Sequence, residues 1–271
     1  MMISHSKLQF LKKIKTKKDF IFYKKINKFS KDPVPYFMDK VGNTEYSFLY
    51  ESVEKGKNKG RYTFCGYGAL SIIANKKNGL YVTEDKKTKK IKRGKNILNQ
   101  INSIISSYKI TNIQSLPPMT SSFFGYLSYE NINNIENIIK RKKTDVLQIP
   151  DCLLFIPETL VIYDNQKSIL YITKIINKNI KNIYQNLINE FEKITVAIKK
   201  NNKYEKINFK KRKKISPKSN ISKSKFVKNI NISKKYIKDG DIFQVVPSHR
   251  FSANYNSTGK KLYQVLRKTN P

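Results

Sequence analysis

The side chains that most often act as nucleophiles, bases or metal ligands are few in this chain and far apart. His5 lies in a polar segment near the start, and His249 lies in a Pro-Ser-His-Arg stretch. Neither belongs to an HExxH or similar ligand pattern, so His249 is interpreted as a structural or surface group. Cys65 and Cys152 form no CxxC pair, which excludes a disulfide scaffold and a cysteine-based metal site.

Motifs that bind phosphate, and carboxylates paired for acid–base work, are also missing. The sequence has no Walker loop and no GxGxxG motif, and its 19 acidic residues show no spacing typical of paired catalysis or Mg²⁺ ligation. From residue chemistry alone, therefore, the chain shows no active site.

The net charge of +36 suggests a nucleic-acid partner, but the kinds of residue argue against one. Of the 55 basic residues 49 are Lys and 6 are Arg, while Ile occurs 36 times and Asn 28 times against 4 Ala and no Trp. Lys, Ile and Asn share A/T-rich codons, so a biased genome explains this composition. A surface selected for phosphate or guanine would retain more Arg, whose planar fork binds them bidentately. We therefore expect no specific nucleic-acid partner, only non-specific binding at low salt.

Length and composition indicate a globular protein. The 271 residues suffice for one large domain or two ordinary ones, and 39% of them are hydrophobic. No apolar run approaches the ~18 residues that cross a bilayer. Lysines interrupt the apolar residues among the first 18, so this segment lacks the apolar core of a signal peptide. It contains no acidic residue, as is typical of transit peptides, but it also lacks the Arg residues that transit peptides favour. The expected location is the cytoplasm, with no membrane partner.

Short β-like runs and two amphipathic helices must position whatever site exists. Hydrophobic periodicity predicts helices over 97–108 and 179–200. Strands are predicted at 46–50, 60–67 and 122–129, with hairpins of 70–74 with 79–83 and of 159–164 with 168–172. Without a βαβ rhythm, this mixture predicts an α+β fold with antiparallel sheets and flanking helices.

The last third differs in composition. Residues 201–221 are basic and poor in apolar side chains, and we interpret them as a linker rather than a localisation signal or nucleic-acid patch. Beyond them a helix over 226–237, a strand over 241–248 and a helix over 258–267 are expected. The predicted domains are thus 1–200, the linker 201–221, and 222–271, which has too little apolar surface to form a core alone.

Four segments, in order, resemble anthranilate synthase component I. Residues 47–53 (SFLYESV) with 60–66 (GRYTFCG) resemble that family's LLES…GRYSFIG pattern. FGYLSYE at 124–130 resembles its GYLGYD segment, and 145–151 with 161–164 resemble the strands that follow. Finally, 236–248 (YIKDGDIFQVVPS) resembles the signature that opens the chorismate-binding domain. The resemblance spans roughly residues 20–271.

This resemblance implies a lyase of tryptophan biosynthesis, the subunit that converts chorismate and ammonia to anthranilate and pyruvate. A glutamine amidotransferase partner would deliver the ammonia, Mg²⁺ would hold the substrate carboxylate, and L-tryptophan would act as feedback inhibitor. In the family, the metal-binding glutamates and the catalytic histidine lie beyond the Asn270-Pro271 pair. The chain therefore resembles an N-terminal portion, incomplete at its C-terminus, with no catalytic or metal residues of its own and no activity alone. An apolar strand left open near Ser248 would favour association and poor solubility.

The resemblance also assigns the tryptophan site. Ser52 matches the feedback residue that holds the amino group of tryptophan, Glu51 suits an ammonium, and Leu49 suits the indole. Tyr50 replaces the family's second Leu, which alters the pocket. The structural alternative is that Phe48 and Tyr50 fill one sheet face while Glu51 and Ser52 begin a turn.

Two further positions carry open interpretations. Arg61 is either a neighbour of the ligand or part of a structural ion pair. Gln244 falls where related enzymes that add water carry a Lys base; a Gln cannot take a proton, which suits ammonia as nucleophile, and the alternative is an ordinary strand residue.

Other functions remain to be weighed. The large subunit of aminodeoxychorismate synthase shares the later motifs, although Glu51-Ser52 with Gly60-Arg61-Tyr62 favours anthranilate synthase. A basic nucleic-acid module would need clustered Arg with exposed aromatics, which the sequence lacks. A free-standing tryptophan sensor would keep the fold without the enzyme, but half of the pocket would be missing.

Overall fold

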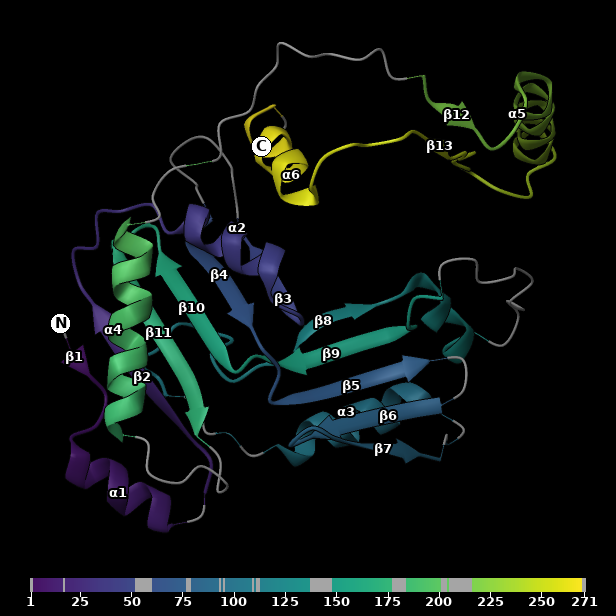
Figure 1. The fold of residues 1–271 in the computed structure, drawn as a ribbon. Helices are drawn as coiled ribbons and strands as arrows, with labels where there is room; N and C mark the ends of the chain where they lie inside the picture. Colours follow the sequence, from purple (N-terminus) through teal and green to yellow (C-terminus); the bar gives the residue numbers. More distant parts are fainter. Residues whose placement is uncertain are drawn as a thin grey trace. The chain divides into compact units, whose positions relative to one another are not determined.

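A computed structural model describes residues 2–16, 18–51, 60–76, 79–92, 94, 96–108, 110, 113–136, 148–176, 184–200, 204 and 216–269 (Figure 1). The chain divides into two compact units. The first comprises 1–204 and 266–271, and the second comprises 205–265. The chain therefore leaves the first unit after Tyr204 and returns to it at Leu266.

A six-stranded antiparallel sheet forms one half of the first unit. Its strands are, in spatial order, β1 (Met2–Ile3), β2 (Phe20–Ile26), β11 (Ile169–Ile176), β10 (Thr159–Asp164), β4 (Tyr62–Tyr67) and β3 (Ser47–Tyr50). Successive side chains of a strand alternate between the two faces. Accordingly Phe20 and Phe22 join one core cluster, while Ile21 and Tyr23 join another.

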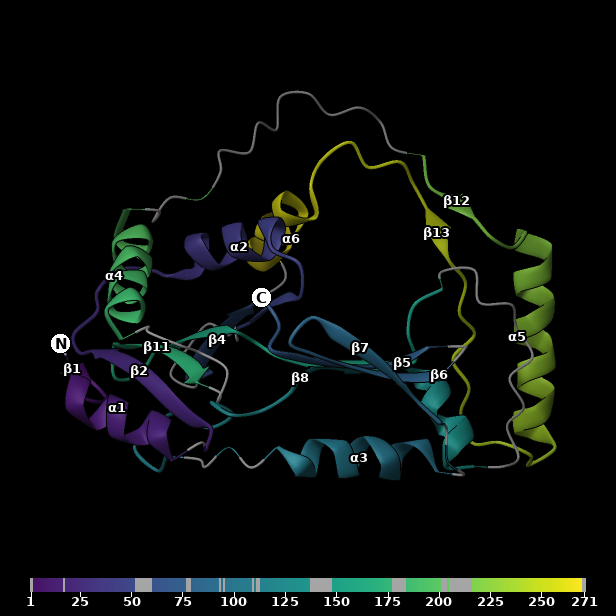
Figure 2. The ribbon, with the colours of Figure 1, turned by 60° about the horizontal axis from the view of Figure 1, so that its bottom comes forward.

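Three helices cover the outer face of this sheet. They are α1 (Lys7–Lys15), α2 (Val34–Asn43) and α4 (Tyr184–Lys200), and Figures 1 and 2 show α4 lying along the sheet. Phe10, Phe37 and Phe191 from these helices are fully buried in the outer cluster. Ser6 starts α1: its side-chain oxygen accepts a hydrogen bond from the backbone N–H of Gln9, and the side-chain oxygen of Gln9 accepts one from the backbone N–H of Ser6.

A five-stranded antiparallel sheet forms the other half. Its order is β7 (Lys87–Ile91), β6 (Gly79–Glu84), β5 (Ser71–Lys76), β9 (Cys152–Ile156) and β8 (Phe124–Leu127). The helix α3 (Ile97–Ser107), capped by Asn96, packs Ile97 and Ile101 against Ile73 and Leu80. A short 3₁₀ helix, η1 (Tyr129–Asn134), follows β8.

An aromatic cluster joins the two sheets and explains two glycines of the recognised motifs. The Phe48 ring stacks on Phe124 with centroids 4.3 Å apart. A Cβ on Gly66 of β4 would overlap the Phe48 ring. Gly125 of β8 has φ +151°, and a Cβ there would overlap the carbonyl oxygen of Leu153. Each position therefore requires glycine for close approach.

The second unit contains little packed structure among its described residues. β12 (Lys218–Ser219) pairs with β13 (Phe251–Ser252), and α5 (Lys223–Lys238) begins at its cap Ser222. The last helix, α6 (Gly259–Thr269), starts in this unit and ends in the first. No hydrophobic side chain is buried between 216 and 265, as expected of a segment too small to form its own core.

Most predicted elements are present, and the α+β class with antiparallel sheets and flanking helices is confirmed. Both predicted hairpins form, as β5–β6 and β10–β11. The predicted helix 97–108 is observed as Ile97–Ser107, and 226–237 is helical. The predicted helix from 179 is observed from Tyr184, since 179–183 lie outside the described residues.

Two expectations were wrong. Residues 241–248 form no strand, because no described strand hydrogen-bonds to them, and Phe243 is fully exposed. His5 does not lie in a free polar tail. The His5 ring packs against the rings of Phe20 and Phe22, at centroid distances of 5.6 and 6.1 Å. The cause is the antiparallel pairing of β1 with β2, which brings the residues after β1 next to the first residues of β2.

Candidate functional site

The end of β3 brings together part of the predicted tryptophan site. Leu49 is partly buried against the outer core cluster, and Tyr50 lies on the opposite face with Phe48, their ring centroids 4.8 Å apart. Glu51 directly follows the strand, and Ser52 lies outside the described residues. The sheet-face interpretation of Phe48 and Tyr50 therefore holds, while Glu51 has a more specific environment.

Glu51 forms a two-point ion pair with Arg267, in the last turns of α6. Arg267 Nε donates to Glu51 Oε1 at 2.7 Å, and Nη2 donates to Oε2 at 2.9 Å. The carboxylate side chain is only 3% exposed, and the Arg267 side chain 18%. Such a fork-to-fork pair is among the strongest charge-assisted hydrogen bonds, because both oxygens and both nitrogens are aligned. Both residues belong to the first unit.

A tyrosine and a second carboxylate extend this pair. Arg267 Nη1 donates to the hydroxyl of Tyr204 at 2.6 Å, and that hydroxyl donates to Asp32 Oδ2, also at 2.6 Å. The Arg267 guanidinium lies 5.2 Å from the centroid of the Tyr204 ring. Asp32, Tyr204, Arg267 and Glu51 thus form one hydrogen-bonded chain, which we call the Glu51–Asp32 network.

The electrostatics of the network keep the Tyr204 hydroxyl protonated and the Arg267 guanidinium charged at neutral pH. Burial raises the pKa of Tyr204, and its hydrogen bond to Asp32 raises it further, so the hydroxyl stays protonated. Burial by itself lowers the pKa of Arg267, but the hydrogen bonds and charge of Glu51 outweigh it and raise the pKa overall. Glu51 therefore holds a charged guanidinium, and Tyr204 serves as a neutral hydrogen-bond bridge.

Sequence reasoning missed Arg267, Tyr204 and Asp32, although one signal could have found the first. In a chain whose basic residues are nearly all Lys, an Arg suggests a position that needs the two-pronged hydrogen bonding of a guanidinium group. The structure describes three of the six arginines. Two of these, Arg61 and Arg267, bind a carboxylate through Nε and Nη2.

Arg61 is part of a structural ion pair, which decides between its two interpretations. Its Nε and Nη2 donate to Asp164 Oδ2 at 3.1 and 3.0 Å. The other oxygen of Asp164 accepts from the backbone N–H groups of Gln166 and Lys167, in the turn between β10 and β11. Arg61 thus fixes the β10–β11 turn against the start of β4.

The remaining candidate nucleophiles and bases lie apart from the network. His249 packs between Phe226 and Phe251, with ring centroids 4.8 and 4.4 Å away, which fits the predicted structural role. Gln244 is exposed in an irregular segment. Both thiols are buried and unbridged, and burial raises the pKa of Cys152 to about 11 and that of Cys65 further. A buried thiol of raised pKa is a poor nucleophile.

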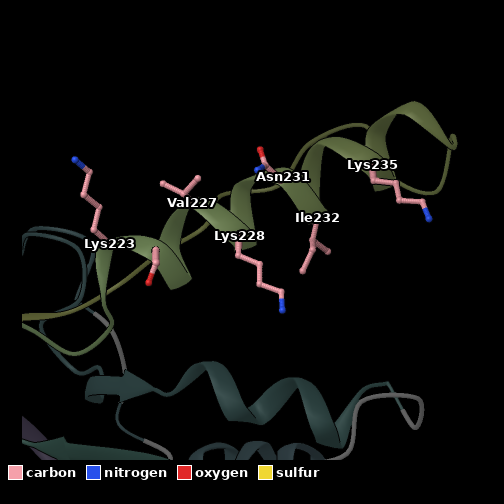
Figure 3. A pocket seen from close by; sticks show the side chains of 7 residues that line it. Lys223, Val227, Lys228, Asn231, Ile232 and Lys235 are labelled. Atoms are coloured by element: carbon pink, nitrogen blue, oxygen red, sulfur yellow. The ribbon is translucent and has the colours of Figure 1, made fainter.

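The hollow beside α5 is not a catalytic site. Figure 3 shows it lined by side chains of a single helix, and it contains neither an acid nor a histidine; the lining residues are Lys223, Ser224, Val227, Lys228, Asn231, Ile232 and Lys235. Because one helix supplies every lining residue, no second element provides an opposing wall.

The part of the chain that the structure describes contains neither a cluster of metal-ligating side chains nor a membrane-spanning helix. No three or more His, Cys, Asp or Glu side chains gather closely enough to hold a metal ion. Among the same residues, no helix combines the length and apolar character needed to span a membrane.

Comparison with known proteins matches the resemblance found in the sequence. The anthranilate synthase component 1 of Acetivibrio thermocellus is 32% identical over 135 residues, which cover 47% of this chain and 27% of that protein. The protein of the same name from Synechocystis sp. is 46% identical over 59 residues, 22% of this chain and 12% of its own. The match therefore spans about a quarter or less of the length of these curated relatives.

A solved structure agrees on the fold. Anthranilate synthase component I from Streptococcus pneumoniae TIGR4 superposes with a TM-score of 0.62 and 22% identity, covering 80% of this chain and 49% of that one. At this identity the likeness shows the fold alone. A family profile described as chorismate binding enzyme, however, matches residues 46–271, most of the chain. The chain therefore belongs to the family of chorismate binding enzymes.

Proposed function

We propose that this chain is part of an anthranilate synthase component I, the lyase that converts chorismate and ammonia to anthranilate and pyruvate in tryptophan biosynthesis. The observation that carries the proposal is the family match over 46–271, together with relatives named anthranilate synthase component 1. Those names also favour this reading over aminodeoxychorismate synthase. A glutamine amidotransferase partner would supply the ammonia, and the cytoplasm is the expected location.

The contribution of this chain is regulatory rather than catalytic in our proposal. The end of β3 would bind L-tryptophan as feedback inhibitor, with Leu49 against the indole, and with Glu51 and Ser52 at the ammonium. Support comes from the burial of Glu51 at 3% exposure and its pairing with a cation, because a desolvated carboxylate of this kind selects a positive partner.

The chorismate-domain signature contributes Gln244, whose amide cannot act as a base. We assign it to the face of the domain where ammonia attacks. The described residues do not fit Mg²⁺, since they include no cluster of three metal-ligating side chains.

Complementation tests the activity directly. The gene that carries this sequence is expressed in one strain that requires tryptophan and in another that requires p-aminobenzoate. Growth of the first strain alone supports anthranilate synthase, whereas growth of the second alone would indicate aminodeoxychorismate synthase and overturn the proposal.

Calorimetry tests the feedback site. L-tryptophan is titrated into the purified 271-residue chain, into Glu51→Gln and into Ser52→Ala. Binding to the native chain that weakens in both variants supports the assignment, and Arg61→Lys is a matched control outside the site. Equal binding to all four proteins would contradict it.

A further inference from the structure

The Glu51–Asp32 network lies where the chain passes between its two units. The chain leaves the first unit after Tyr204 and returns at Leu266, one residue before Arg267. We call residues 205–265, which form the second unit, the 205–265 excursion. The hydrogen bond from Arg267 Nη1 to the Tyr204 hydroxyl, at 2.6 Å, therefore connects the residues that flank its two ends. Chain ends that are hydrogen-bonded together close the intervening loop and remove part of its freedom.

Both ends are also anchored to the body of the first unit. Tyr204 donates a hydrogen bond to Asp32, which precedes α2. Arg267 donates two hydrogen bonds to Glu51, at the end of β3. The guanidinium also lies 5.2 Å from the centroid of the Tyr204 ring, which adds a cation–π contact. Arg267 is the only member of the network that contacts both Glu51 and Tyr204, so its position depends on both.

We propose that Arg267 is a positioning residue that clamps the two ends of the 205–265 excursion together, and that a ligand ammonium binding Glu51 displaces it and opens the clamp. The second half of this proposal rests on the proposed tryptophan site at Glu51; the clamp itself does not.

The geometry makes the two cations compete. Arg267 occupies both carboxylate oxygens of Glu51 through aligned donors, at 2.7 and 2.9 Å. An ammonium donates to the same oxygens, so it must displace at least one arm of the fork. Two cations at a carboxylate that is 3% exposed would also repel each other in a low-dielectric site. When the two hydrogen bonds from Arg267 to Glu51 are lost, nothing in the network keeps Arg267 Nη1 within reach of the Tyr204 hydroxyl. Ligand binding at Glu51 is thereby coupled to the hydrogen bond that joins the two ends of the 205–265 excursion.

A double-mutant cycle tests the clamp without any ligand. Urea unfolding is followed for the full chain, Glu51→Gln, Arg267→Met and the variant with both changes. We expect Arg267→Met to lower the midpoint, because it removes the two-point ion pair from a buried carboxylate, and Glu51→Gln to restore part of that loss in the double variant. Additive losses would overturn the pairing.

NMR of the arginine side chains observes the Nε–H of Arg267 directly. It can be measured on the native chain, so it remains informative if a variant is unstable. With six arginines in the chain, the Nε–H region is sparse, and Arg267→Lys and Arg61→Lys assign two of its signals. In the free protein, Arg267 Nε–H should exchange with water about tenfold or more slowly than a free arginine, because it donates to a buried carboxylate. Tyr204→Phe, which lacks the bridging hydroxyl, should speed that exchange and leave Arg61 unchanged; no effect of Tyr204→Phe would refute the bridge.

L-tryptophan and indole-3-propionate, which lacks the ammonium, test the displacement. Tryptophan should shift the Arg267 signal and remove its protection, while indole-3-propionate should not, and the Arg61–Asp164 pair is the internal control. If tryptophan binds by calorimetry but Arg267 stays protected, the displacement is wrong. If tryptophan does not bind at all, the proposed feedback site fails, and the double-mutant cycle and the Tyr204→Phe exchange measurement decide the clamp.

Discussion

At the scale of single residues, partly exposed guanidinium groups meet carboxylates that are almost fully buried. Asp164 is 2% exposed, whereas Arg61 is 39% exposed, so the carboxylate is the desolvated member of that pair. Its oxygens accept two hydrogen bonds from Arg61 and two from the backbone of the β10–β11 turn. The stability of the turn therefore depends on Asp164 more than on Arg61.

Two variants at Asp164 separate the ion pair from the turn. Asp164→Ala removes all four hydrogen bonds and should lower the free energy of unfolding by about 2–4 kcal/mol. Asp164→Asn keeps an oxygen for the backbone N–H groups of Gln166 and Lys167 and should lose clearly less. Urea unfolding of both variants makes the measurement, and equal losses would show that the turn bonds contribute nothing.

His5 makes native stability depend on pH. Burial lowers its pKa below the ordinary 6.5, and the charge of Lys13 acts in the same direction. The unfolded chain therefore takes up the proton first as the pH falls. The stabilising contribution is present above about pH 6.5 and is lost as the pH falls through the lower pKa of the folded state.

His5→Phe removes this titration and keeps a ring between Phe20 and Phe22. Urea midpoints of the native chain and the variant are compared from pH 8 to pH 5. The midpoint of the native chain should fall relative to that of the variant below about pH 6.5. A difference that is constant over this range would contradict the assignment.

At the scale of elements, one lysine joins β2 to α4 across an apolar face. Lys24 is fully buried, and its Nζ lies 2.7 Å from Glu192 Oε1 and donates to Thr195 Oγ1 at 3.0 Å. Glu192 is 45% exposed, so water solvates much of its charge. A second pair between the same sheet and helix, Lys174–Glu190, is more exposed at its lysine and serves as a comparison.

This asymmetry predicts unequal effects within one ion pair. Lys24→Met replaces the buried ammonium by an apolar side chain of similar length and should change stability by less than about 1.5 kcal/mol. Glu192→Ala leaves the ammonium buried with Thr195 as partner and should cost about 2 kcal/mol. Glu190→Ala is the matched control and should cost at most about 1 kcal/mol. Thermal or urea unfolding measures the free energy of unfolding of each variant. A larger loss for Lys24→Met than for Glu192→Ala would contradict this explanation.

At the scale of the whole molecule, the net charge of +36 dominates long-range behaviour. A surface of lysines attracts any polyanion through counterion release, but lysines lack the bidentate fork that reads a base. Charge of this kind supports non-specific association and indicates no sequence-specific nucleic-acid function.

Salt titration distinguishes the two kinds of binding. The chain should bind two unrelated DNA duplexes equally at 50 mM salt, and the affinity should fall by roughly 10³-fold or more by 200 mM. Fluorescence anisotropy with labelled duplexes measures both affinities. Salt-resistant binding to one of the two sequences would instead support the nucleic-acid module that the sequence argues against.

Local patterns in the amino-acid sequence were enough to predict the hairpins and the first long helix, and the motifs also indicated the family. The hairpins β5–β6 and β10–β11 follow from alternating apolar residues around short turns, and α3 follows from its helical stripe. The motif glycines Gly66 and Gly125 were visible as sequence, although only the packed structure shows the ring and the carbonyl that forbid a Cβ there.

Features that depend on contacts between distant segments became apparent from the folded chain. Residues 241–248 have the apolar pattern of a strand, yet a strand also needs a partner's backbone hydrogen bonds, and none of the described strands supplies them. Likewise Glu51 and Arg267 are 216 positions apart, and their pairing leaves no mark in the local sequence of either. Periodicity records which face of an element is buried, whereas the partner of a buried charge is set by how separate elements pack together.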